Sequence, residues 1–70
     1  MSILNNLVHK DARGQKIVAG DYITPHGGST VGIVLWLYTD SNRAVVEWFG
    51  RSRKNVYLGH MAKLEIEDII

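Results

Sequence analysis

The chain has 70 residues, of which 46% are hydrophobic and none is cysteine, and its formal net charge is +1. This length allows one domain near the lower size limit for folding without staples, and the lack of cysteine excludes disulfides, thiolate metal sites and thiol catalysis. So small a net charge does not by itself argue for a strongly electrostatic partner such as duplex DNA.

The first residues lack the basic segment and long apolar run of a signal peptide. No stretch approaches the roughly 18 apolar residues of a membrane span. We therefore expect a soluble cytoplasmic protein with no membrane partner.

The N-terminal segment has the spacing of a short amphipathic helix. Apolar residues at positions 3, 4, 7 and 8 share one helical face, and Ser2 can cap its start. We expect a helix or arm over residues 1–10, followed by a barrel over residues 17–66 in a single domain. The helix would either cover an open end of the core or bind a partner.

Residues 11–30 alternate turn formers with short apolar runs. Asp11 and Gly14 fit a tight turn that begins with an Asx side chain and ends on a glycine at positive φ. A second turn at Gly20 precedes a first strand over residues 22–24. Residues 25–30 combine a proline with paired glycines, which predicts a connecting loop. A phosphate-binding loop would need a following helix, whereas a strand follows here.

Two apolar runs, residues 31–38 and 44–49, flank the turn formers of residues 39–43 and predict a β-hairpin. In the second run Glu47 marks the solvated face, so Ala44, Val46 and Trp48 should point into the core. The first run is apolar on both faces, and each face must be covered. Either the N-terminal helix or another chain covers its outer face.

The remaining chain predicts a turn over residues 50–54, a fourth strand over 55–58, a helical turn over 59–62 and a last strand over 63–66. The count is five short strands with turn signals at regular intervals. This pattern is typical of an all-β small barrel or sandwich.

Three parts of the sequence resemble small β-barrel families. The pattern Asp11-x-x-Gly14-x-x-Ile17-x-x-Gly20-Asp21-x-Ile23 resembles the entry segment of SH3-like barrels, which are frequent in short phage-encoded proteins. Residues 20–37 are similar to the KOW motif, in which a glycine-spaced loop leads into a Gly-x-Val strand. Residues 46–64 resemble the second half of Tudor-like barrels, with a Val-x-Trp strand, a polar turn, a tyrosine and a late leucine.

The resemblance implies an SH3-like barrel of about five strands and a nucleic-acid-associated role, although residues 27–32 lack the basic side chains that KOW loops usually carry. The Gly-x-Val pattern also implies that Val34 faces the core. That orientation leaves Ile33, Leu35 or Leu37 outside, where they form a candidate protein-interaction surface.

Cations and aromatic side chains near the hairpin form a candidate nucleic-acid site. The cations would contact phosphates while a ring stacks on a base. The candidate residues are Arg43, Arg51, Arg53 and Lys54 for phosphates and Phe49, Trp36 and Tyr38 for stacking. Aromatic side chains also fill cores, and we expect that role for Trp48 and Tyr57, whereas the other three fit either role.

No catalytic constellation can be assembled from the spacing, and His9, His26 and His60 are too scattered to hold a metal. We therefore expect a non-enzymatic binding module without a cofactor or metal. Its partner is either nucleic acid or a protein. The protein alternatives are a phage accessory protein that binds a host factor and a structural subunit that self-associates through the two-faced strand.

Overall fold

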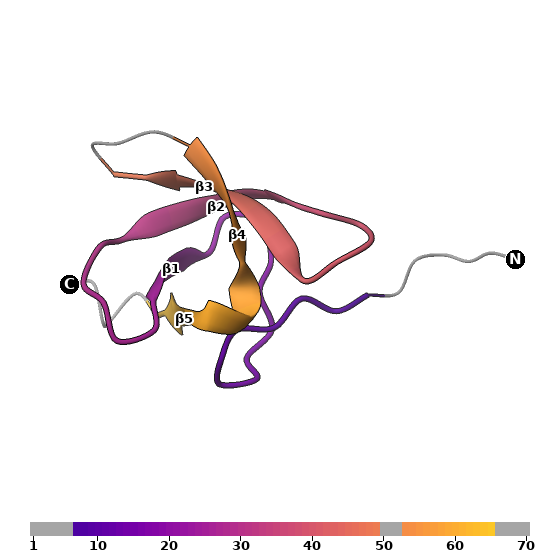
Figure 1. Ribbon diagram of the computed structural model, residues 1–70, viewed down its shortest axis with the longest axis horizontal. Helices are drawn as coiled ribbons and strands as arrows, with labels where there is room; N and C mark the ends of the chain where they lie inside the picture. The colour runs from indigo at the N-terminus through magenta and orange to yellow at the C-terminus, as the bar shows by residue number, and fades with distance from the viewer. Residues whose placement is uncertain (1–6, 50–52, 66–70) are drawn as a thin grey trace, which may run out of the picture.

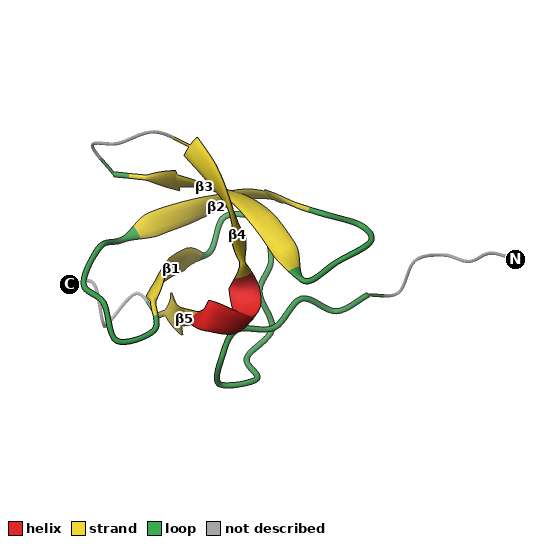
Figure 2. Cartoon of the chain, in the orientation of Figure 1, coloured by secondary structure: helices red, strands yellow, loops and turns green. Residues whose placement is uncertain are grey.

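The structure of the protein is a computed structural model, in which residues 7–49 and 53–65 are described. The chain folds into one antiparallel five-stranded sheet in the order β4-β3-β2-β1-β5 (Figure 1). The strands are β1 (Tyr22–Pro25), β2 (Gly32–Leu37), β3 (Arg43–Trp48), β4 (Arg53–Tyr57) and β5 (Met61–Leu64). A single 3₁₀ turn, η1 (Leu58–His60), joins β4 to β5 (Figure 2). The predicted all-β class is confirmed, but β4 and β5 do not pair, so the sheet does not close into a complete barrel.

The core lies on the inner face of this sheet. Ala44, Val46 and Trp48 of β3 are buried, as the position of Glu47 predicted, and Val34 of β2 is buried beside them. The remaining buried hydrophobic residues among those described are Ile17, Ile23 and Leu58. Gly32 lets β2 approach β3 closely, because a Cβ there would lie 2.5 Å from Val46 Cγ1. The core therefore draws on the N-terminal loop, on three strands and on η1.

A β-bulge in β2 changes which side chains face outward. Val34 pairs with Val46, but the next pair along the strands is Trp36 with Val45, so Leu35 is the extra residue. Beyond the bulge Leu37 pairs with Ala44 and packs against the core. The expected outward orientation of Leu37 is wrong, because strict alternation fails wherever one strand carries an extra residue.

Several predicted boundaries shift. Arg53 and Lys54 belong to β4, not to the preceding turn, and pair with Glu47 and Val46 of β3. The helical turn begins earlier than predicted, at Leu58, so the last strand also begins earlier, at Met61 rather than residue 63. Cross-strand pairing with β3 outweighs the local turn signal of a charged segment here. The predicted end of the last strand at residue 66 lies outside the described residues.

The expected N-terminal helix falls mainly on residues 1–6, which lie outside the described residues. Leu7 to His9 have no helical structure, and Lys10 forms an isolated antiparallel bridge with Lys16.

The two turns predicted next are confirmed. Asp11 Oδ1 accepts the N–H of Arg13 at 2.9 Å, and Gly14 has φ +83°.

The outer edge of β5 is covered by this N-terminal loop. Ala12 N donates to Met61 O at 2.8 Å, Lys63 N donates to Asp11 Oδ2 at 2.8 Å, and Arg13 Nη2 donates to Lys63 O at 2.8 Å. Asp11 is buried and also accepts the N–H groups of Arg13 and Gln15 through Oδ1. One side chain therefore both builds the turn and attaches it to the sheet.

Burial acts to raise the pKa of the Asp11 carboxyl, but its hydrogen bonds from the backbone of Lys63, Gln15 and Arg13 and the nearby Arg13 guanidinium lower it. The net effect places the Asp11 pKa below its ordinary value of 3.8. The charged form is favoured because three backbone donors point at it.

Candidate nucleic-acid interface

The outer face of β2, β3 and β4 brings together most of the predicted site residues. Cross-strand partners in an antiparallel sheet lie on the same face. Trp36 pairs with Val45, which pairs with Asn55, and Arg43 pairs with Tyr57. We call this surface the outer face and define it by the side chains of Ile33, Leu35, Trp36, Tyr38, Arg43, Val45, Glu47, Phe49, Arg53, Asn55 and Tyr57.

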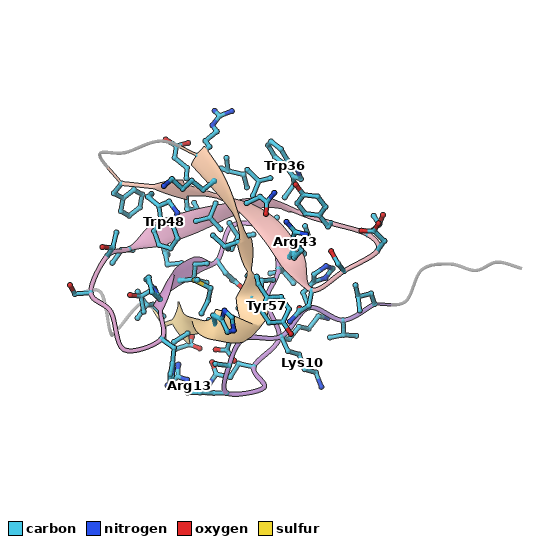
Figure 3. The ribbon with its side chains drawn as sticks, in the orientation of Figure 1. Lys10, Arg13, Trp36, Arg43, Trp48 and Tyr57 are labelled. Atoms are coloured by element: carbon cyan, nitrogen blue, oxygen red, sulfur yellow. The ribbon has the colours of Figure 1, made fainter. Side chains whose placement is uncertain are left out.

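One end of the outer face is an aromatic and cationic cluster. The Trp36 side chain is 52% exposed, and the Arg43 guanidinium carbon lies 5.6 Å from the centre of the Tyr38 ring, a cation–π distance. Arg43 Nη2 also donates to Asn55 Oδ1 at 2.7 Å. In the view of Figure 3, Arg43 lies between Trp36 and Tyr57. Arg43 has no ion-pairing carboxylate among the described residues, so its other donors can reach a ligand.

Tyr57 was expected in the core but is 50% exposed on this face. It ends β4 opposite Arg43, and its ring packs edge-on against His60 with centroids 5.0 Å apart. Gly59 leaves room for the ring, since a Cβ there would lie 2.5 Å from Tyr57 Cε2. The aromatic side chain is thus held in place by η1 while one side stays open to solvent.

The other end of the outer face carries a second aromatic pair. Phe49 is 54% exposed, and its ring centroid lies 5.9 Å from that of Tyr22 in β1. Phe49 lies two positions after Glu47, so the two side chains lie on the same face of the sheet. Phe49 lies four positions after Val45, the partner of Trp36, so the two aromatic ends lie about 13 Å apart along the direction of β3.

The predicted cations are not all equivalent. Arg53 lies on the outer face, but its Nε is 3.6 Å from Glu47 Oε1, which partly neutralises it. Lys54 pairs with buried Val46, so it leaves β4 on the opposite face, at the exposed margin of the sheet. Arg51 lies outside the described residues. Arg43 is therefore the described cation best placed beside the aromatic side chains.

The loop between β2 and β3 is fixed by the N-terminal segment. Asn42 Oδ1 accepts Lys10 N at 3.0 Å, and Asn42 Nδ2 donates to Lys10 O at 2.9 Å. His9, which is buried, has its Nε2 2.6 Å from Tyr38 O. These contacts hold both ends of the segment that carries Tyr38 and Arg43.

Sequence reasoning missed Tyr57, Asn55 and Asn42 as site residues. Arg43 and Tyr57 are 14 positions apart, and only the β3–β4 register places them opposite each other. Counting back from Tyr57 in steps of two gives Asn55 and Arg53. These three side chains therefore lie on one face of β4, provided that the start of the strand is known. Asn42 shows no such signal, because its hydrogen bonds reach a segment 32 residues away.

Comparisons with protein-family models, curated proteins and solved structures gave no match to this chain. Its fold and its site together define a small all-β protein with an exposed aromatic and cationic sheet face. Among the described residues, no helix has the length and apolar character needed to cross a membrane, and no three acidic or histidine side chains converge as a metal site would require.

Proposed function

We propose that this protein is a small non-enzymatic module that binds single-stranded nucleic acid weakly through its outer face. The observation that carries the proposal is the half-exposed Trp36 beside Arg43, whose guanidinium lies over Tyr38 and has no carboxylate partner among the described residues. A base stacked on an aromatic side chain contributes about 1–3 kcal/mol. Arg43 would supply the phosphate contact that aligns the strand.

Stacking of this kind requires unpaired bases, which favours single strands over duplexes. The outer face offers few cations for phosphate, and the eight Lys and Arg residues of the chain are nearly balanced by seven Asp and Glu residues. If three phosphates are neutralised, the slope of log affinity against log salt is about −2 for a single strand. Binding should therefore be weak, and its affinity should fall roughly 20-fold between about 50 and about 200 mM salt. A cytoplasmic location, and the host cytoplasm if the protein is phage-encoded, belongs to the same proposal.

One observation favours a second candidate, a protein-interaction module such as a phage accessory protein that binds a host factor. Beside Trp36 the outer face carries a half-buried apolar row formed by Ile33, Leu35 and Val45. Such a row with an aromatic anchor also suits a protein partner. Leu37 lies against the core and does not extend this row.

A fluorescence anisotropy titration with labelled single-stranded DNA, single-stranded RNA and duplex DNA at about 50 mM salt tests the proposal, and a repeat at about 200 mM salt measures the slope. We expect Trp36→Leu and Arg43→Ala each to weaken single-strand binding at least fivefold, which corresponds to about 1 kcal/mol. Lys16→Ala is the matched control. It removes the same charge from the N-terminal loop beside β5 and should leave affinity within about twofold.

The absence of binding to either single strand at low salt would contradict the nucleic-acid proposal and favour the protein-interaction candidate. Equal weakening by Lys16→Ala and Arg43→Ala would also contradict it, because binding would then depend on net charge and not on the outer face.

A further inference from the structure

The backbone of β4 leaves hydrogen-bonding groups directed away from the sheet. Tyr38 N donates to Arg43 O at 2.9 Å, which assigns the backbone groups of Arg43 to the β2 side. Bonding direction alternates along an antiparallel strand, so Ala44 and Val46 bond to β4. Their partners in β4 are Val56 and Lys54.

The other β4 residues therefore point their N–H and C=O groups outward, and these are Arg53, Asn55 and Tyr57. β4 is the last strand in the sheet order, and no described segment pairs with its far side. Leu58 N, which donates to Asn42 O at 2.9 Å, continues the same alternation and supports the assignment. We call β4 (Arg53–Tyr57), whose outward backbone groups have no described partner, the free edge. It is five residues long and adjoins the outer face.

We propose that this edge pairs antiparallel with β4 of a second copy of the chain, on a two-fold axis at Asn55. The groups that point outward can then bond to each other in closely spaced pairs, Asn55 with Asn55 and Arg53 with Tyr57 of the partner copy. Lys54 lies opposite Val56 of the partner copy. The sequence Arg53–Tyr57 is therefore self-complementary in this register.

Charge and strand length favour this register over its two neighbours. A shift by two residues in one direction would place Lys54 directly opposite Lys54 of the partner copy, and like charges directly opposite each other are destabilising. A shift in the other direction would place Val56 on the axis and Arg53 opposite Gly59, beyond the end of β4. With Asn55 on the axis, Arg53 lies opposite Tyr57 and Lys54 opposite Val56 of the partner copy, so no like charges are directly opposed. A second copy is also favoured by the small core, because a domain with seven buried hydrophobic side chains among its described residues gains stability from association.

Pairing about this axis keeps both outer faces on the same side of one ten-stranded sheet, since directly paired residues share a face. The two β2 strands would then lie five strand spacings apart, about 24 Å. Both Trp36 side chains would belong to one continuous surface. This dimer does not depend on nucleic-acid binding, so it can be tested without nucleic acid.

Sedimentation equilibrium of the full chain without nucleic acid, from about 10 μM to about 1 mM, tests the dimer, because so short an interface implies weak association. We expect a reversible equilibrium between one and two monomer masses. Asn55→Pro should raise the dissociation constant at least tenfold, because proline removes the N–H on the two-fold axis and leaves the backbone hydrogen bonds to β3 in place, although the side-chain bond to Arg43 is lost.

Asn55→Thr is the matched control, since it keeps the N–H and suits a strand, and it should dimerise like the original chain. Asn55→Lys is a second variant that retains the backbone N–H. It places two ammonium groups at the axis, each near the Arg43 guanidinium of its own chain, so its dimer should weaken at low salt and recover at high salt. Circular dichroism melts of all three variants establish that each is folded.

A single monomer mass over the whole concentration range would overturn the proposal and leave the edge to a heterologous strand. Undiminished dimerisation of both Asn55→Pro and Asn55→Lys would overturn it as well. A chain that dimerises without binding oligonucleotides contradicts only the proposed function, and a monomer that binds them contradicts only the dimer.

Discussion

The two edges of the sheet meet the same physical requirement in opposite ways. An edge strand presents unpaired N–H and C=O groups that must find partners. At β5 the loop of Asp11, Ala12 and Arg13 supplies those partners through hydrogen bonds of 2.8 Å to Met61 and Lys63. At β4 no described segment does so.

The two edges therefore differ in what they contribute. The β5 edge holds the fold together, whereas the β4 edge is not paired by any described segment. The covered edge attaches the start of the chain to its end, across about 50 residues of sequence. Such contacts stabilise the fold and occupy backbone groups of this edge that would otherwise be unpaired. The free edge lies next to Tyr57 and Asn55, which belong to the outer face. Both proposed interaction surfaces therefore lie toward the β4 edge of the sheet, away from the β5 edge that Asp11, Ala12 and Arg13 cover.

Removing the Asp11 side chain, which covers the β5 edge, should give the largest loss of stability. Asp11→Ala leaves the N–H groups of Arg13, Gln15 and Lys63 without their acceptor, and we expect a loss of about 3 kcal/mol in the free energy of unfolding. Urea denaturation measures it. Asp11→Asn is the control, because it keeps one carbonyl oxygen and should lose less. A loss below about 1 kcal/mol for Asp11→Ala would show that this edge does not depend on the carboxylate.

Acid should weaken the same edge by a smaller amount. The folded-state pKa of Asp11 is lowered, so the unfolded chain binds its proton first as the pH falls. The contribution of Asp11 is therefore complete above its ordinary pKa of 3.8 and is lost as the pH falls through the lower folded-state value. We expect the unfolding free energy to drop over this range more steeply than in Asp11→Asn, as measured by urea denaturation at each pH. Parallel profiles for the two proteins would contradict this role.

The smallest effects come from paired substitutions at the two edges. Arg13→Ala removes the hydrogen bond to Lys63 O and should cost about 1 kcal/mol. Lys54→Ala removes the same charge from the exposed β4 edge and should change stability by less than about 0.5 kcal/mol. Thermal unfolding followed by circular dichroism compares them. Equal losses would remove the distinction between a covered and a free edge.

Local sequence signals predicted part of this structure well. The alternation around Glu47 gave the inward side chains of β3, and the Asx–glycine turn at Asp11 and Gly14 formed as expected. Both depend on neighbouring residues alone. The candidate site was predicted in part, since Trp36, Tyr38, Arg43, Phe49 and Arg53 do share the outer face, whereas Arg51 lies outside the described residues.

The orientation of Leu37, the exposure of Tyr57 and the strand position of Arg53 and Lys54 were not predicted correctly. The bulge at Leu35 reverses the alternation in β2, and a bulge is defined by the partner strand, not by the bulged sequence. The exposure of Tyr57 follows from its place opposite Arg43 at the end of an edge strand. Each of these outcomes depends on long-range pairing that a single sequence does not contain.

The sequence by itself determined an all-β chain with five short strands, its main turns and the inward face of β3, because periodicity and turn chemistry act over a few residues. Tertiary structure alone decided the register, the bulge and the two edges. The β3–β4 register places Arg43 opposite Tyr57. The buried Asp11 carboxylate accepts a hydrogen bond from Lys63 N, 52 positions later in the chain. Hydrogen bonds between distant segments fix these features, so they exist only once the sheet has formed.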